Sequence, residues 1–354
     1  MTDPPGIRRA HVEPYLRNAL PIGDEALEFE LVGGGRSNLT YRVRAGGRSW
    51  ALRRPPLGHV IATAHDMSRE FRVLSALADT PVPVPRPIAL CEDPEVNDAP
   101  FYVMEFCEGV VLQDDAPKGF ARTAAEGRAL SQALVDTLVT LHGIDPGAVG
   151  LADFGRPAGY LERQVRRWSK QWEANRTGEL PEIEELLTRL ARALPASSDA
   201  SIVHGDYRLG NMALDPADPG RIVAVFDWEM ATLGDPLADL GYTLIYWVEA
   251  GDDLGGDAVS ATTITAGPGF FTRDEIVAAY AQGSGRDVSS IDFYQVLALT
   301  KLAIISEGIF KRFQLGKTVG AGSRDTARAT RPLALRAMAI AERSGDPRLA
   351  GGGG

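Results

Sequence analysis

Cysteine and histidine are scarce in this chain, with 2 cysteines, Cys91 and Cys107, and 5 histidines among 354 residues. Two cysteines are too few for a disulfide framework or a thiolate metal site, and we expect both thiols to stay reduced. Excess positive charge is also missing, because 37 Lys and Arg residues face 47 Asp and Glu residues, for a formal net charge of -10. This balance disfavours nucleic acid and anionic membranes as partners, since both require a basic face.

Long apolar runs are absent as well. No window approaches the roughly 18 uninterrupted apolar residues of a membrane span, and the first ten residues, MTDPPGIRRA, lack the apolar stretch of a signal peptide. These patterns predict a soluble, cytoplasmic protein with no membrane contact. The chain is 44% hydrophobic and 24% charged, as globular proteins are, and it is longer than one hydrophobic core usually serves.

The first 106 residues show short strand-like runs, separated by glycine-rich or proline-rich turns, and one amphipathic helical segment. The proline-dense segment TPVPVPRPIAL cannot be a helix, because proline does not continue one. Its end and the segment PFYVMEF are predicted to be two further strands. The other predicted elements are strands at 28–32, 40–44 and 49–53 and a helix at 64–78.

From residue 107 the pattern becomes mainly helical, with one compact β segment at 201–227. The stretch 251–269, rich in Gly, Ala and Thr, is predicted to be a surface loop. The predicted helices are 124–142, 158–175, 182–194, 236–249, 273–282, 291–314 and 325–344. We therefore predict an α+β fold with two lobes, a small β-rich lobe at 1–106 and a larger, mainly helical lobe at 107–350.

Two short segments, HGDYRLGN and VFDWE, each follow an apolar β run and carry the candidate chemistry. Phosphoryl transfer needs a carboxylate that orients and deprotonates the attacking hydroxyl, for which Asp206 is the candidate. It also needs oxygen ligands for Mg²⁺, and Asn211 and Asp227 have the right chemistry. HGD alone has another interpretation, a turn in which Asp206 caps backbone N–H groups. The three groups together favour a reaction centre.

These same segments resemble the catalytic loop and metal-binding motif of the aminoglycoside phosphotransferase and choline kinase superfamily, which shares the protein-kinase fold. The resemblance implies that Asp206 is the catalytic base and that Asn211 and Asp227 are Mg²⁺ ligands. It also implies that His204 is a structural residue of the loop. The implied phosphate donor is ATP, with GTP as the alternative.

The resemblance also implies nucleotide contacts in the first lobe. In the place of the superfamily's phosphate-binding Lys this chain has Arg53, with Glu70 as its partner on the following helix. Arg keeps the charge but not the geometry, so subfamily variation and weaker nucleotide binding both stay open. The remaining implied contacts are Gly34, Gly35, Ser37 and Asn38 in the turn GGGRSN, and Glu105 and Phe106 at an adenine-binding hinge, for which a plain turn and a plain buried strand are the alternatives.

The stretches GYLERQVRRWSKQWEANRT, HGDYRLGNMALDP and FDWEMATLGDPLADLGY resemble the phosphotransferase-like domain of acyl-CoA dehydrogenase family members ten and eleven, over about residues 25–345. This resemblance implies a small-molecule hydroxyl acceptor on an acyl chain, such as a hydroxyacyl-CoA or a hydroxy acid. The predicted helix at 160–175 is net basic, which suits an anionic acceptor, although a solvated helix face is the alternative.

Two other functions stay open. An aminoglycoside O-phosphotransferase would line its acceptor cleft with acidic side chains, because its substrates are polycations. A non-catalytic, pseudokinase-like module would bind nucleotide without transferring phosphate, and the departure at Arg53 is the observation in its favour. Asp235 at a predicted helix start and Asp239 one turn later are expected to be structural supports, with Asp239 bracing the catalytic loop. Glu229 is left open, as is the oligomeric state.

Overall fold

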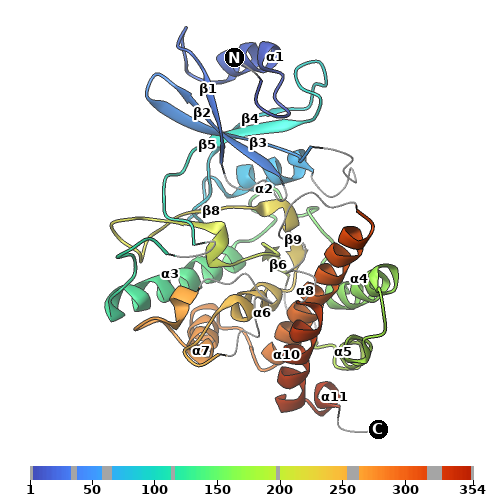
Figure 1. Ribbon diagram of the computed structural model, residues 1–354. Coiled ribbons are helices and arrows are strands. Elements are labelled where there is room, and N and C mark those ends of the chain that lie inside the picture. Colours follow the sequence, from blue (N-terminus) through green and yellow to red (C-terminus); the bar gives the residue numbers. More distant parts are fainter. Residues whose placement is uncertain are drawn as a thin grey trace.

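The computed structural model describes residues 3–32, 38–57, 66–112, 116–196, 200–252, 263–316 and 329–351. Gly34, Gly35 and Ser37 of the predicted phosphate loop lie outside these residues. A β-rich part forms the upper end of the molecule in Figure 1, and a larger, mainly helical part lies below it. The predicted α+β, two-lobed architecture is therefore confirmed.

The upper part is built on one five-stranded antiparallel sheet, in the order β1-β2-β3-β5-β4. Strand β2 shows why these residues form strands, because its side chains alternate between buried and partly exposed along its whole length. The strands are β1 (Glu28–Val32), β2 (Leu39–Ala45), β3 (Arg48–Arg54), β4 (Pro87–Cys91) and β5 (Phe101–Glu105).

A helix that the sequence pattern did not predict, α1 (Arg9–Ala19), precedes the sheet and covers its upper end. Its two buried residues, Val12 and Leu16, form a stripe too narrow to stand out in a segment that contains Pro14. These residues join the inward side chains of β2, β3 and β5 in a separate apolar core. The packing against the sheet stabilises a helix that its own sequence specifies weakly.

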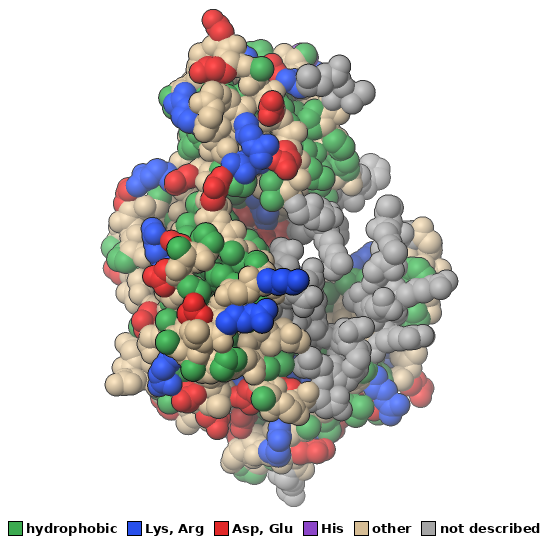
Figure 2. All heavy atoms as spheres, turned by 60° about the vertical axis from the view of Figure 1, so that its left-hand side comes forward, with side chains coloured by type: hydrophobic (Ala, Val, Ile, Leu, Met, Phe, Trp, Pro, Cys, Tyr) green, Lys and Arg blue, Asp and Glu red, His purple; other side chains and the backbone are tan. Residues whose placement is uncertain are grey.

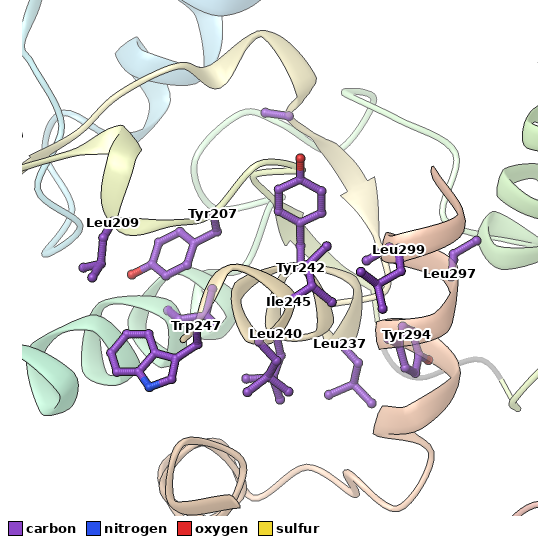
Figure 3. Close-up of a cluster of buried hydrophobic side chains, with 14 of the residues drawn as sticks. Tyr207, Leu209, Leu237, Leu240, Tyr242, Ile245, Trp247, Tyr294, Leu297 and Leu299 are labelled. Carbon is purple, nitrogen blue, oxygen red and sulfur yellow. The ribbon is translucent and has the colours of Figure 1, made fainter. Parts of the chain in front are cut away.

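The main core extends from the other face of the sheet into the helical part. Helix α2 (Met67–Leu77) lies between the two parts and buries Met67, Val73 and Leu74 in this main core. The helices below are α3 (Ala124–Gly143), α4 (Tyr160–Asn175), α5 (Pro181–Arg192), α6 (Leu237–Tyr246), α7 (Arg273–Ser284), α8 (Ile291–Gln314), α10 (Thr330–Arg343) and α11 (Pro347–Ala350). Figure 3 shows where α6 meets α8, with Leu237, Leu240 and Tyr294 packed in the contact.

Helix α8 is the one helix in the described part of the chain that is long and apolar enough to cross a membrane by composition. Of its most apolar window, 67% is buried inside the protein. It packs against α4, α5, α6 and α10, which accounts for its apolar character as that of a core helix.

Two small antiparallel pairs carry the loops of the site. Strand β6 (Ser201–Val203) pairs with β9 (Thr232–Gly234), and β7 (Met212–Leu214) pairs with β8 (Ile222–Val225). The chain leaving β5 is joined to this region by a bridge between Val110 and Leu214. The two motif segments therefore emerge side by side, close to the junction with the upper sheet.

The predicted surface loop at 251–269 is only partly supported, and residues 253–262 lie outside the described part. The rest is tied to the core, because the Thr265 hydroxyl accepts from the N–H of Val248 and donates to its carbonyl, both at 2.9 Å. Thr265 is buried. A buried hydroxyl that satisfies a helix-terminal backbone is a tertiary feature that composition does not indicate.

Candidate active site

The loop after β6 is held by its own histidine. His204 is fully buried, and its Nε2 lies 2.9 Å from the carbonyl oxygen of Phe226, which can only accept a hydrogen bond. Its Nδ1 lies 3.2 Å from the N–H of Asp206, which can only donate. One ring nitrogen must donate and the other accept, so the imidazole is in the neutral Nε2–H form. His204 is thus placed as the structural residue that the resemblance implied.

Asp239, on α6, braces the same loop from below. Its two oxygens accept the backbone N–H groups of His204 and Gly205, each at 2.7 Å, and the Nε2 of His142 lies at 3.3 Å. Burial acts to raise the pKa of Asp239, but the hydrogen bonds that it accepts from His142 and from the backbone N–H of Gly205 help to lower it overall. The expected bracing role of Asp239 is confirmed. Asp235 accepts from the N–H of Leu237 at the start of this helix, as a structural support should.

Asn211 orients the Asp206 side chain. Its Nδ2 donates to Oδ2 of Asp206 at 2.7 Å and to the Asp206 carbonyl at 2.9 Å. The other carboxylate oxygen, Oδ1, is buried and has no hydrogen-bond partner among the described residues, and Nε of Arg208 lies 3.5 Å from it. A carboxylate with one oxygen fixed and the other unbonded is suited to accept the proton of a hydroxyl.

Asp227 lies next to this pair because the two loops are bonded through Phe226. The N–H of Phe226 donates to the Asn211 carbonyl at 2.8 Å, while the Phe226 carbonyl accepts from His204. Asp227 has a φ of 66°, one of two positive values at non-glycine positions in the described residues. Left-handed backbone at such a residue costs roughly 1–2 kcal/mol, and it is typical of functional loops.

Arg53 joins the sheet to this centre. Its Nε donates to Oε2 of Glu70 at 3.0 Å, and its Nη2 donates to Oδ1 of Asp227 at 2.5 Å. Burial acts to lower the pKa of Arg53, but Glu70 and Asp227 outweigh it and raise the pKa, so the guanidinium stays charged. Burial raises the pKa of the Glu70 carboxyl, and Arg53 opposes that effect. The neighbouring Arg54 points to the opposite face of β3 and donates to Gly6, a structural contact.

The donor set at this centre fits a Mg²⁺ ion shared with phosphates. Both Nδ2 contacts of Asn211 go to Asp206, which leaves its Oδ1 for a cation, and Asp227 adds a carboxylate. In the described part of the chain no cluster of three or more His, Cys, Asp or Glu side chains forms a closed metal site. Mg²⁺ usually takes one or two protein carboxylates and completes its shell with water and substrate phosphate.

The remaining predicted nucleotide contacts are placed less directly. Asn38 is buried, and its Nδ2 donates to Oε2 of Glu229 at 3.0 Å, so it ties the end of the glycine-rich turn to the metal loop. The N–H of Glu105 is already donated to the Arg86 carbonyl at 2.8 Å. An adenine edge would therefore have to use other backbone groups of the hinge, and Phe106 stays a prediction.

The sequence pattern did not single out two cations that the fold brings to Asp206. Arg208 lies two residues after Asp206 within the same motif, so its position was a signal that could have been used. Lys301 comes from the middle of α8, and its Nζ donates to the Gly205 carbonyl at 3.2 Å. Figure 2 shows both signs of charge in the recess where the upper and lower parts meet.

The fold and this site define a kinase-like phosphotransferase, and comparison with known proteins agrees. A family model described as "Phosphotransferase enzyme family" matches residues 28–294, and the chain belongs to that family. Acyl-CoA dehydrogenase family member 10 of Mus musculus is 33% identical over 342 residues, covering 94% of this chain and 31% of that protein. Family member 11 of Gallus gallus is 32% identical over 353 residues, covering 95% of this chain and 44% of that protein. The chain thus spans less than half of these curated relatives.

Solved structures show the same fold. A protein of Ralstonia eutropha JMP134, provisionally described as an aminoglycoside phosphotransferase, is 33% identical with a TM-score of 0.81, covering 95% of this chain and 99% of that one. Aminoglycoside phosphotransferase APH(4)-Ia, in ternary complex with ADP and hygromycin B, has a TM-score of 0.62 at 15% identity, covering 95% and 99%. The latter similarity concerns the fold alone. The predicted family resemblance is confirmed.

Proposed function

We propose that this protein transfers the γ-phosphate of ATP to a hydroxyl group of a small molecule in a Mg²⁺-dependent reaction. The observation that carries the proposal is the convergence of Asp206, Asn211 and Asp227 with Arg53 of the upper sheet. Four groups from three separate segments meet with the charges that phosphoryl transfer requires.

The side chains have separate roles in this proposal. Asp206 orients the acceptor hydroxyl and accepts its proton at the unbonded Oδ1, while Asn211 keeps the carboxylate in place. Arg53, fixed by Glu70, binds the phosphates. Mg²⁺, when bound by Asn211 and Asp227, supplies charge neutralisation at the phosphate oxygens. Positioning and charge stabilisation account for most of the catalysis in such reactions.

We further propose that the acceptor is anionic, a hydroxyacyl-CoA or a hydroxy acid. The relatives of about one-third identity are acyl-CoA dehydrogenase family members, which supports an acyl compound. Helix α4 carries Arg166, Arg167 and Lys170 on its surface, although Arg166 is paired with Glu162. An aminoglycoside is the second candidate, on the strength of the Ralstonia similarity, but a polycation would face repulsion from these side chains.

The test is Mg²⁺- and ATP-dependent ADP release over a panel of hydroxyacyl-CoAs, hydroxy acids and aminoglycosides. We expect turnover with an anionic acceptor, and a fall of about 10³-fold in Asp206→Asn with Mg-ATP binding retained, because the general base alone is lost. Turnover with aminoglycosides only would overturn the acceptor class. Mg-ATP binding without ADP release for any acceptor would favour the pseudokinase-like alternative.

A further inference from the structure

Lys301 is a partly buried cation without an acidic partner. Its Nζ donates to the Gly205 carbonyl at 3.2 Å and lies 4.5 Å from the centre of the Tyr242 ring. Throughout the described ranges, no carboxylate lies within 4.0 Å of this ammonium group. Burial lowers the pKa of Lys301, and the charges of Asp206 and Asp239 oppose that effect. A cation kept in such a place costs stability unless an anion joins it.

A second cation lies on the same side of Asp206. The Arg208 guanidinium is centred 4.9 Å from the Tyr246 ring, and its Nε is buried without a hydrogen-bond partner. Tyr242 and Tyr246 are one helical turn apart on α6, with their hydroxyl oxygens 3.5 Å from each other. Two cations therefore lie close to Asp206, and both retain hydrogen-bond donors: the Lys301 ammonium group has three and uses one on Gly205, and Nε of Arg208 makes no hydrogen bond to the described residues.

This cluster lies on the side of Asp206 away from the proposed nucleotide contacts. Arg53 and Glu70 reach the centre from β3 and α2 above, whereas Lys301 and Tyr242 reach it from α8 and α6 below. Figure 3 shows Tyr242 rising from α6 on the side opposite Leu237 and Leu240. In an in-line transfer the attacking and leaving oxygens lie on opposite sides of the phosphoryl group, so the lower side belongs to the acceptor.

We propose that Lys301, supported by the Tyr242 ring and the field of Arg208, binds an anionic oxygen group of the acceptor, a carboxylate, beside the reacting hydroxyl. The assignment rests on the proposed function and adds a residue that determines specificity. An ammonium group with donors to spare attracts a carboxylate, leaves a neutral group of the same shape weakly bound and repels a cation. Of the two acceptor classes proposed above, Lys301 thereby selects the free hydroxy acid, because the acyl group of a hydroxyacyl-CoA is a neutral thioester with no carboxylate beside the hydroxyl.

The experiment measures carboxylate binding without phosphoryl transfer. Alkanoates from butanoate to decanoate carry the carboxylate but no hydroxyl to phosphorylate, and their primary amides match them in shape without the charge. Binding of both series is measured by calorimetry to the full chain with Mg²⁺ and AMP-PNP, a non-hydrolysable ATP analogue. We expect the wild type to prefer alkanoates at least tenfold, and Lys301→Met to lose that preference.

The matched control is Lys311→Met. Lys311 lies on the same helix and donates to the Ala174 carbonyl at 2.7 Å, but it is ten residues beyond Lys301, about 15 Å further along the helix axis. It should keep the wild-type preference, and Lys301→Arg should restore most of it. The proposal is overturned if the wild type binds alkanoates no better than amides, or if Lys301→Met keeps the preference.

A purely structural role gives a different result. If Lys301 only braced the Gly205 carbonyl, Lys301→Met would weaken AMP-PNP binding and amide binding as much as alkanoate binding, and that outcome also overturns the proposal. The two proposals fail separately, because ADP release tests the reaction and alkanoate preference tests the subsite. If no acceptor gave ADP release but the wild type still preferred alkanoates in a Lys301-dependent way, the phosphotransferase proposal would be rejected and the anion site would be retained.

Discussion

Asp239 is the residue on which the geometry of the catalytic loop depends. Fully buried, it accepts two backbone N–H groups of that loop and contacts His142. Asp206, the proposed general base, follows directly after these two N–H groups, so its position is set by the Asp239 side chain. Asp239 therefore acts as a positioning residue.

We expect Asp239→Asn to lower the free energy of unfolding by about 3 kcal/mol at neutral pH, because an amide NH₂ would face backbone N–H donors. The folded pKa of Asp239 is lowered, so its stabilisation is present above the ordinary Asp pKa of about 3.9 and is lost as pH falls through the folded value. The gap between wild type and variant should narrow below about pH 4. Denaturant unfolding over a pH series measures this difference in the free energy of unfolding.

Asp24→Asn is the control for that series, since Asp24 is exposed. Its unfolding curve should follow the wild type within about 0.5 kcal/mol at every pH. A gap between wild type and Asp239→Asn that stayed constant down to low pH would contradict the ionised, hydrogen-bonded state of Asp239.

At the scale of elements, the contact of α6 with α8 holds two sides of the site in register. Helix α6 carries Asp239 and Tyr242, and α8 carries Lys301. Gly241 allows the close approach, because a Cβ added there would lie 2.6 Å from Cβ of Tyr294. Tyr294 is in turn fixed by its hydroxyl, which donates to Oδ2 of Asp235 at 2.8 Å.

Gly241→Ala should lower the free energy of unfolding by about 1–3 kcal/mol through overpacking of this contact. Gly143→Ala, at the end of α3, is the matched control, because an added Cβ meets no atom within 4 Å there. Its effect should stay within about 0.5 kcal/mol. Thermal and denaturant unfolding compare the two, and equal stability of both variants would contradict the tight packing inferred at Gly241.

At the scale of the whole molecule, α2 joins the sheet to the helical part. Arg69, next to Glu70, donates through Nη2 to the carbonyls of Phe154 at 2.5 Å and Ala231 at 3.0 Å. Its Cζ lies 3.7 Å from the centre of the Phe154 ring. These contacts hold the helix that carries Glu70, the partner of Arg53, against the lower part, so the position of the proposed nucleotide contacts depends on packing between the two parts.

Arg69→Met should therefore destabilise the protein by about 2–3 kcal/mol and raise the KM for ATP several-fold, since Glu70 would lose its support. Arg72→Met is the control from the same helix. Arg72 pairs with the exposed Asp153 and is itself exposed, so its loss should cost no more than about 1 kcal/mol. Calorimetry and steady-state kinetics measure both effects. A KM for ATP that is the same in Arg69→Met and Arg72→Met would refute this coupling.

The formal net charge of the chain is -10, yet three cations, Arg53, Arg208 and Lys301, lie around the carboxylates of the candidate site. A cleft with low-dielectric walls concentrates the field of such local cations, so the acidic net charge of the chain is compatible with the proposed nucleotide and anionic acceptor.

The sequence by itself determined the fold class and most helices, and it singled out Asp206, Asn211 and Asp227, which the structure brings together in one candidate site. Those features are local, because each motif follows its own β run and each helix carries its own apolar period. Helix α1 was not predicted because it lacks such a local pattern: only two of its residues, Val12 and Leu16, are buried. The departure at Arg53 was visible, but its ion pair with Asp227 was not.

Tertiary structure alone decided which distant side chains meet the centre. Lys301 lies 95 residues after Asp206, on a helix whose apolar pattern predicts only that the helix is buried. The sequence around Tyr242 likewise predicts only an aromatic residue of the core. Their contact with the catalytic loop results from the angle at which α6 and α8 pack, and side-chain periodicity along one helix carries no information about that angle. The residues of the proposed reaction can therefore be identified from the sequence motifs, whereas the proposed choice of acceptor depends on how the helices pack beneath those motifs.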